Sequence, residues 1–293
     1  MKKRLRQKSK IILYTLTVLF VILIIWTIWG NQALMVNTFT ISSHRIPAAF
    51  SGFRIAQISD LHNTEFGEHN TTLLKLLSES KPDIIVITGD LIDAHHTNID
   101  IALDFAKEAI QIAPTYYVTG NHEANSSQYH TLQMGLKETG IIVLEDEAIP
   151  LEHNREKITL IGLSDPNFII KGDIFGEIPD IVLKKLKPLI DNQNSYHILL
   201  SHRPELFECY ASYNIDLIFS GHAHGGQFRL PFIGGLIAPN QGFFPKYDAG
   251  LYTDGNTHMI VSRGIGNSII PFRFNNRPEI ILVELNSKKN KGN

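Results

Sequence analysis

Two histidines one residue apart, His222 and His224, lie in the glycine-rich stretch 221–227, directly after the apolar run 215–220. The apolar run is typical of a buried strand, and the glycines allow the backbone to turn sharply and leave space for a ligand. Imidazole side chains are common metal ligands in proteins. The stretch therefore predicts a metal site, with a surface turn that happens to hold histidines as the alternative.

Four further polar clusters also follow strand-like runs, and they contain residue types that bind metal ions. They are Asp60 with His62, Asp90 with Asp93, Asn121 with His122, and His202. In α/β sheets, ligands bind beyond the carboxyl ends of the strands, so five such ends favour a shared site over chance. Mixed oxygen and imidazole donors suit Mn, Fe, Zn or Co, and the lack of cysteine ligands argues against a structural zinc site.

The elements that must position these clusters alternate between strand and helix in the first half of the chain. The patterns predict strands at 36–41, 53–59, 84–88 and 115–119, and helices at 70–80, 99–110 and about 127–140. Later strands are predicted at 141–144, 148–151, 157–163, 196–201, 215–220, 227–230, 258–263 and 279–285, with a helix opened by Pro179. Residues 236–257, rich in Gly, Pro and aromatics, predict a long surface loop that could lie near the site. We expect one α/β domain over 36–286 and a polar tail at 287–293.

Residues 11–29 carry no charged side chain and are long enough to span a bilayer core as a helix. Trp26 and Trp29 lie near the outer end, where aromatic belts occur. A cleaved signal peptide is the alternative, but the apolar run is longer than a usual signal sequence and lacks a clear cleavage site. Six basic residues within 1–10 place that segment in the cytoplasm. We expect a single-pass protein of the cytoplasmic membrane with its domain outside; the opposite insertion is the other alternative.

Charge and cysteine content limit the classes of function. Six of the 27 basic residues lie within 1–10. The rest of the chain therefore has 21 basic and 29 acidic residues, a net charge of about −8. Such a domain is not built to bind nucleic-acid backbones, and we expect no nucleic-acid partner. A single cysteine, Cys209, excludes an internal disulfide framework and is interpreted as a small core residue.

The five clusters resemble the calcineurin-like metallophosphoesterase superfamily. Its pattern of D-x-H, G-D-x-x-D, G-N-H-[DE], a lone H and G-H-x-H is present in order from Asp60 to His224. The tighter resemblance is to a membrane-associated bacterial subfamily. It is carried by the stretches 59–62, 221–227, 262–267, 271–274 and 277–279. One minor departure is Ala223, where Thr is more common and is not a ligand.

The resemblance implies an α/β/β/α sandwich with a centre of two divalent metal ions. Asp60, His62 and His224 would hold the first ion; Asn121, His202 and His222 would hold the second; and Asp90 would bridge them. A water activated by the two ions would attack phosphorus in line, and the ions would stabilise the developing charge. Phosphoester hydrolysis is among the reactions that proteins perform with paired metal ions.

The resemblance also implies roles for two residues beside the ligands. His122 would protonate the leaving oxygen or donate to the phosphate, and Asp93 would orient His122. The alternative for Asp93 is a helix N-cap after a strand. Arg203, Arg263 and Arg273 could bind a second phosphate, since guanidinium groups match it well, or could form surface ion pairs. Glu123 is interpreted as a second layer of support or a cap, and His95 and His96 as solvated loop residues.

The sequence therefore predicts a membrane-anchored, metal-dependent phosphohydrolase that cleaves a phosphodiester or pyrophosphate bond. The alternative is a non-catalytic metal-binding surface protein on the same fold, although all seven ligand positions and His122 are present. An external site close to the bilayer favours phospholipid head groups, lipid-linked sugar pyrophosphates or wall polymers as substrates over cytoplasmic cyclic nucleotides.

Overall fold

Two six-stranded sheets form the centre of the domain in the computed structural model, which describes residues 2–171, 176–190, 195–267 and 270–288. The first sheet has the spatial order β1 (Met35–Ser43), β16 (Glu279–Ser287), β2 (Arg54–Ile58), β3 (Ile84–Thr88), β4 (Thr115–Val118) and β5 (Ile142–Val143). The second has the order β14 (Gly250–Asp254), β15 (Thr257–Val261), β9 (Leu217–Ser220), β8 (His197–Leu200), β7 (Glu156–Gly162) and β6 (Glu147–His153). In both sheets the strands that lead to the metal-ligand candidates run parallel.

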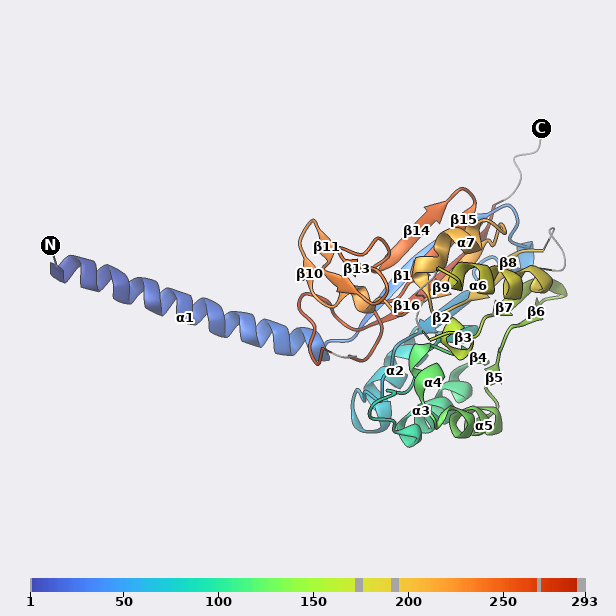
Figure 1. The fold of residues 1–293 in the computed structure, drawn as a ribbon, viewed down its shortest axis with the longest axis horizontal. Coiled ribbons are helices and arrows are strands. Elements are labelled where there is room, and N and C mark those ends of the chain that lie inside the picture. Colours follow the sequence, from blue (N-terminus) through green and yellow to red (C-terminus); the bar gives the residue numbers. More distant parts are fainter. Residues whose placement is uncertain (1, 172–175, 191–194, 268–269, 289–293) are drawn as a thin grey trace.

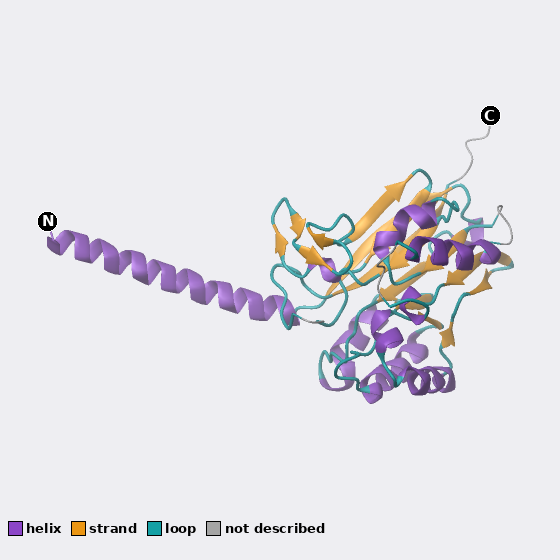
Figure 2. Ribbon diagram, viewed as in Figure 1, coloured by secondary structure: helices purple, strands orange, loops and turns teal. Residues whose placement is uncertain are grey.

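Helices cover the outer face of each sheet, which gives the predicted four layers α/β/β/α (Figures 1 and 2). The first sheet is covered by α2 (Thr71–Glu79), α3 (Ile99–Ile112) and α5 (Tyr129–Thr139); the second by α6 (Ile178–Leu186) and α7 (Phe207–Ala211). A short α4 spans Asn121–Asn125, and 3₁₀ turns lie at Ala48–Phe50, Glu68–Asn70, Pro166–Phe168, Lys187–Leu189, Pro204–Leu206 and His224–Gly226.

Strand alternation explains the layers. In β3, Ile85 and Ile87 pack under the helices of the first sheet, whereas Ile84 and Val86 face the second sheet. A strand buried on both faces reads as a continuous apolar run, as the sequence of β3 does. Three apolar cores result, one between the sheets and one beneath each helical layer.

The N-terminal helix α1 (Lys2–Gln32) projects from one end of the domain (Figure 1). Its stretch Arg6–Gln32 is long and apolar enough to cross a membrane, and none of its most apolar window is buried. Only two residues separate its end from β1. The side chains of residues 1–5 and residues 289–293 of the predicted tail lie outside the described part of the chain.

Three sequence expectations need correction. Residues 236–257 are not one loop, because they contain the small hairpin β12 (Ile237–Ala238) and β13 (Gly242–Phe243), and the edge strand β14. A second small hairpin, β10 (Arg229–Leu230) with β11 (Gly234–Gly235), precedes it. The last strand extends past residue 285 to Ser287, which pairs with Ser43. Cys209 is half-buried beside the core beneath α6 and α7 rather than within it.

Candidate metal centre

The carboxyl ends of five strands bring the predicted ligands together. Asp60 follows β2, Asp90 follows β3 and Asn121 follows β4 in the first sheet, while His202 follows β8 and the His222–His224 turn follows β9 in the second. The two sheets face each other, so their strand ends meet at one edge of the sandwich. Two of the resulting clusters contain three buried metal-ligating side chains each, with donor atoms within 4.8 Å of one another.

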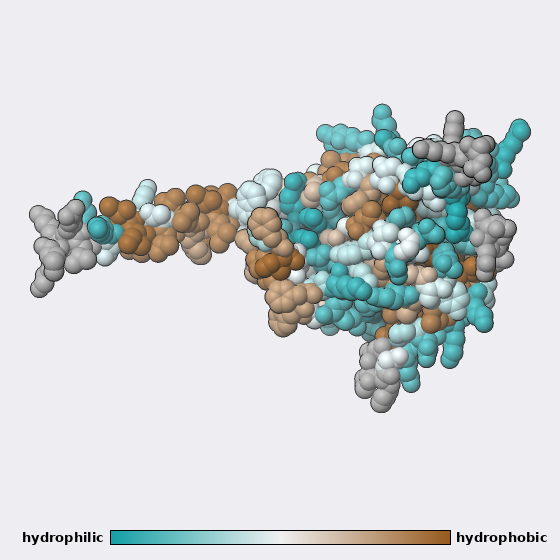
Figure 3. Space-filling view, turned by 90° about the horizontal axis from the view of Figure 1, so that it is seen from above, coloured by the Kyte–Doolittle hydropathy of each residue, from teal (hydrophilic) through white to brown (hydrophobic). Residues whose placement is uncertain are grey.

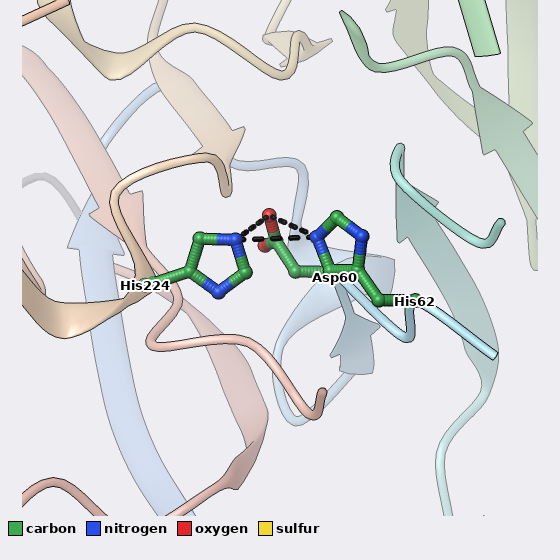
Figure 4. Close-up of side chains that lie close together, drawn as sticks. All are labelled: Asp60, His62 and His224. Carbon is green, nitrogen blue, oxygen red and sulfur yellow. Dashed lines mark hydrogen bonds and ion pairs between the residues drawn. The ribbon is translucent and has the colours of Figure 1, made fainter. Parts of the chain in front are cut away.

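The first cluster consists of Asp60, His62 and His224 (Figure 4). The Nε2 atoms of His62 and His224 lie 3.2 Å apart, and the Oδ1 of Asp60 is 3.5 Å from the Nε2 of His224. The Asp60 carboxylate is held in place by the backbone N–H of His222, which donates to it at 3.0 Å. Three donor atoms from three side chains therefore point toward one location.

The second cluster consists of Asp90, His202 and His222, with Asn121 beside it. The Nε2 of His202 lies 3.1 Å from the Oδ2 of Asp90 and 3.2 Å from both the Oδ1 of Asn121 and the Nδ1 of His222. The Nδ1 of His202 contacts the carbonyl oxygen of Thr88 at 2.7 Å. Because that carbonyl can only accept, the Nδ1 donates and the Nε2 faces the cluster.

Asp90 lies between the two clusters. Its Oδ2 is 3.6 Å from the Nε2 of His62 in the first cluster and 3.1 Å from the Nε2 of His202 in the second. Its Oδ1 accepts from the backbone N–H of His122 at 2.9 Å. One carboxylate is thus placed to serve both clusters.

Five of the seven ligand candidates have left-handed backbone conformations. Their φ angles are 53° for Asp60, 47° for His62, 54° for Asp90, 65° for His222 and 48° for His224. This region costs residues other than glycine roughly 1–2 kcal/mol each. Strain that recurs at one site points to a function that requires it.

Glycines permit the strand ends to approach one another. A Cβ on Gly221 would overlap the Oγ of Ser59 and the Oδ2 of Asp60, and a Cβ on Gly120 would overlap the Asp90 carboxylate. The residue before Asp90, Asn121 and His222 lies against a neighbouring strand end, where a Cβ would clash. This steric limit explains why glycine precedes each of these three ligand candidates.

Burial shapes the charges at the site. Burial lowers the pKa of His62 to about 3 and moves the pKa values of His222 and His224 well below their ordinary value, so these imidazoles are neutral. Burial also raises the pKa of Asp60 to about 6. For His202 burial acts in the same direction as for the other imidazoles, but the adjacent Asp90 outweighs it and raises the pKa to about 10.

His122 and Asp93 lie at the edge of the first cluster. The Nδ1 of His122 accepts from the backbone N–H of Ala94 at 2.9 Å and lies 3.6 Å from the Oδ2 of Asp93. The Oδ1 of Asp93 accepts from the backbone N–H groups of His95 and His96 at 2.8 and 2.9 Å. Asp93 therefore caps the turn after β3 and faces His122, and the helix N-cap interpretation is wrong, because the N-cap of α3 is Asn98. His95 and His96 are exposed, as expected.

Glu123 supports the turns that carry two of the ligands. Its carboxylate accepts from the backbone N–H groups of Asp90 at 2.8 Å, Gly120 at 2.7 Å and Ile92 at 3.2 Å. Burial, and then the neighbouring Asp90, raise the pKa of Glu123 to about 7. The capping role expected for Glu123 is therefore present.

Arg203 belongs to the site in a way that the sequence did not indicate. It is buried and forms a two-pronged ion pair with Asp165, with its Nε and Nη2 at 2.6 and 2.9 Å from the carboxylate. Its Nη1 donates to the Oδ1 of Asn240 at 3.0 Å and lies 3.2 Å from the Nε2 of His222. The Nε2 of His222 is also 3.0 Å from Asn240. Asp165 and Asn240 lie in no recognisable motif, so only the fold brings Asp165 to Arg203 and Asn240 to His222.

The other two arginines have partners of their own outside the two clusters. Arg263 pairs with Glu279 at 3.6 Å. Arg273 is buried, and its guanidinium donates to the backbone carbonyls of Arg263 and Gly266 and to the side chain of Asn267. The ion-pair interpretation holds for Arg203 and Arg263, although the Arg203 pair is buried, and neither interpretation describes Arg273.

The donor set fits two divalent cations. The clusters combine carboxylate and amide oxygens with imidazole nitrogens, a mixture suited to Mn, Fe, Zn or Co. The Nε2 atoms of His62 and His224 face each other at 3.2 Å, and both imidazoles are neutral, so neither repels a cation. A cation between them would accept both nitrogen lone pairs.

Comparison with known proteins agrees with the geometry. A family model described as Calcineurin-like phosphoesterase matches residues 53–226. The chain is 32% identical over 258 residues to the uncharacterized metallophosphoesterase YkuE of Bacillus subtilis (strain 168), covering 85% of this chain and 84% of that protein. It is 29% identical over 243 residues to phosphodiesterase YaeI of Escherichia coli (strain K12), covering 80% of this chain and 82% of that protein. The crystal structure of TT1561 of Thermus thermophilus shares the fold, with a TM-score of 0.50 and 13% identity over 73% of this chain and 91% of that one.

Proposed function

Because this chain belongs to the calcineurin-like phosphoesterase family and is a metallophosphoesterase, we propose that it is a membrane-anchored hydrolase of phosphodiester or pyrophosphate bonds. The position of Asp90 carries the proposal, since its Oδ2 reaches both clusters at 3.6 and 3.1 Å. A single carboxylate shared by two ligand sets is the arrangement that two adjacent ions require.

Seven residues would hold the ions. Asp60, His62 and His224 would bind the first, Asn121, His202 and His222 the second, and Asp90 both, as the sequence resemblance implied. Paired divalent ions supply an activated water and stabilise the negative charge that develops on the phosphate oxygens. Mn, Fe, Zn and Co all remain suited to the donor set.

We further propose that His122 donates a proton to the substrate. Its Nδ1 accepts from the backbone N–H of Ala94 at 2.9 Å, so the proton of the neutral ring resides on the Nε2. The Oδ2 of Asp93 lies 3.6 Å from the Nδ1, so a carboxylate faces the side of the ring opposite the Nε2. The Nε2 of His122 can then donate to the leaving oxygen or to the phosphate.

Helix α1 would anchor the enzyme. Its exposed apolar stretch meets the length requirement for a span, and six basic residues within 1–10 favour a cytoplasmic N-terminus. The domain over 36–286 would then lie outside the membrane. Substrates that such a site could meet are phospholipid head groups, lipid-linked sugar pyrophosphates and wall polymers.

The test is hydrolysis of bis(p-nitrophenyl) phosphate and p-nitrophenyl phosphate by the full chain in detergent, with each metal in turn. We expect metal-dependent activity and two ions per chain by elemental analysis. Asp90→Ala should lower kcat/KM at least ~100-fold, because loss of a ligand should exceed the loss caused by residues that only support ligands. His224→Ala should lose mainly one of the two ions.

Asp254→Ala is the matched control, because Asp254 is an exposed acid on β14 and should leave activity unchanged. Full activity in Asp90→Ala would refute the shared-ligand role. Absence of metal-dependent hydrolysis of every ester by the wild-type chain would refute the proposed function.

A further inference from the structure

The junction between helix and domain holds one face of the domain against the end of α1. Helix α1 ends at Gln32 and β1 begins at Met35. The side chain of Asn31 bonds to both the backbone N–H and the carbonyl of Arg273, at 2.7 and 2.8 Å. The guanidinium of Arg277 lies 4.9 Å from the ring of Trp29 and donates to the carbonyl of Ala33 at 2.7 Å. A domain held this closely to a spanning helix has its adjoining face at the bilayer surface.

That face carries exposed apolar side chains. Phe232 is fully exposed, and Ile233, Phe243, Phe244 and Phe272 are 60%, 76%, 65% and 47% exposed. Residues 230–245 contain no charged side chain. We call these five residues the contact face. The hairpins that carry four of them lie beside the domain end of α1, and hydrophobic surface continues from the helix onto the adjoining part of the domain (Figures 1 and 3).

An apolar groove lies between the hairpin β12–β13 and the ligand candidate His224. It has a volume of about 390 Å³ and is lined by residues that include His224, Asn240, Ile237, Ala238, Pro239 and Ile270. The hairpin β12–β13 forms one wall of this groove and also carries Phe243. The side chain of Gln227 donates to the carbonyls of Ile270 and Phe272 at 2.9 and 2.7 Å, which joins the ligand turn to the segment bound to α1.

The groove has one catalytic end and one apolar wall, and this combination restricts its ligand. His224 belongs to the first metal-ligand cluster, and Asn240 contacts His222 of the second. A small hydrophilic phosphoester would leave the apolar lining without a partner, whereas a hydrocarbon chain would bury it at about 25 cal/mol per Å². Exposed clusters of this kind mark surfaces that bind a membrane or a protein, and continuity with a spanning helix favours the membrane.

We infer that the contact face inserts into the bilayer surface and that the groove takes the hydrocarbon part of a phosphoester drawn from the membrane, with its phosphate at the metal centre. This inference rests on the proposed function and specifies its substrate class as an amphiphilic phosphoester. The aromatic side chains occupy the interfacial region beside Trp26 and Trp29, where such rings concentrate.

The first test compares p-nitrophenyl methyl phosphate with p-nitrophenyl hexadecyl phosphate, using the full chain in alkyl maltoside micelles with Mn. The two diesters share a leaving group and differ only in the chain. We expect kcat/KM to be at least ~10-fold higher for the hexadecyl ester, because each buried methylene favours binding. The double variant Phe232→Ser with Phe243→Ser should lose most of that preference and keep the methyl ester rate. Ile142→Ser is the matched control, since Ile142 is 42% exposed on β5, away from α1.

The second test does not depend on activity. In a Cys209→Ser background, a polarity-sensitive dye is attached after Phe243→Cys or Ile142→Cys, and the full chain is placed in phosphatidylcholine nanodiscs. We expect blue-shifted emission from position 243 and water-like emission from position 142. Water-like emission from both positions would overturn the inference.

The outcomes separate the two proposals. Equal kcat/KM for both esters would overturn the lipid inference while leaving the hydrolase standing. No hydrolysis of either ester, with a blue shift at position 243, would count against the proposed function and support the membrane contact. If the double variant instead turned a dimer into a monomer and kept the chain-length preference, the contact face would be a self-association surface and the inference would be wrong.

Discussion

Asp216 shows how a single buried charge can set the pH response of the fold away from the metal centre. It lies directly before β9, at the opposite end of that strand from the ligand turn, and it is only 3% exposed. Its carboxylate pairs with Arg45 at 2.7 Å and accepts from the backbone N–H of His197 at 2.8 Å. Burial nevertheless dominates and raises the pKa of Asp216 from 3.8 to about 6.

This raised pKa predicts a stability that falls as the pH rises. Between pH 3.8 and about 6 the folded chain binds more protons at Asp216 than the unfolded chain does. The stabilisation is therefore present below pH 3.8 and lost as the pH rises through about 6. The shift corresponds to roughly 3 kcal/mol. The free energy of unfolding is measured in urea for the full chain at pH 4 and at pH 7. Its decrease from pH 4 to pH 7 should be smaller in Asp216→Asn than in the wild type. Asp254→Asn, on the exposed β14, is the control, and equal losses in all three proteins would contradict the assignment.

Residues at the candidate metal centre differ in how far the sequence reveals them. Asp60, Asp90 and His202 could be predicted because each follows a buried strand, and strands of known direction place their carboxyl ends together. For Arg203 the sequence predicts an ion pair as one of two roles but does not indicate its partners. Its partner Asp165 lies 38 positions away in no pattern, and Asn240 reaches His222 only through the folding of residues 236–244. Contacts made by loops over long sequence distances leave no periodic signal.

Among the elements, β2 and β9 illustrate how glycine joins the two sheets at the site. Gly221 follows β9 and lies against Ser59 and Asp60, which follow β2. The backbone N–H of the next residue, His222, donates to the Asp60 carboxylate at 3.0 Å. The approach of these two strand ends therefore sets both the packing of the sheets and the position of a ligand candidate.

The variant Gly221→Ala should disturb both properties at once. Its Cβ would overlap the Oγ of Ser59 and the Oδ2 of Asp60, and overpacking of this kind costs about 1–3 kcal/mol. We expect a lower free energy of unfolding in urea together with reduced metal content. Gly30→Ala is the matched control, because a Cβ there meets nothing within 4 Å. A variant with normal stability and two bound ions would show that the strand ends can separate freely.

The elements that sequence analysis missed share a physical cause. The sequence of β14 predicts a loop because Gly250–Asp254 is a largely exposed edge strand that pairs with only one neighbour, β15. The hairpin of β12 and β13 has two residues in each strand, too few to show alternation. Central strands such as β3 are buried on both faces, and their continuous apolar runs made their positions predictable.

At the scale of the whole molecule, the contact face lies at the end of the sandwich from which helix α1 projects (Figure 1). Helix α1 leaves the domain at the end that carries the small hairpins (Figure 1). The groove is lined by hairpin residues such as Ile237 and by the ligand candidate His224. The apolar stretch 11–29 is about 28 Å long as a helix, close to the thickness of a bilayer core. The anchor would thus determine the orientation of the active site as well as its location.

Orientation in the membrane is the property that the basic segment should control. Six Lys or Arg residues precede the apolar stretch, and the stretch 11–43 that follows them contains no charged residue. Segments rich in Lys and Arg stay on the cytoplasmic side of a membrane, so residues 1–10 are predicted to be cytoplasmic and the domain after the helix to be external. Fusion of alkaline phosphatase to the C-terminus should give active enzyme, and fusion of a cytoplasm-dependent fluorescent protein should give no fluorescence.

Replacing Lys2, Lys3, Arg4 and Arg6 with Asn should weaken this preference and produce a mixed population. The same replacements at Lys184, Lys185 and Lys187, in and just after α6, should have no effect. Fluorescence without phosphatase activity in the wild-type fusions would show the opposite insertion, and the contact face would then meet the inner surface of the membrane.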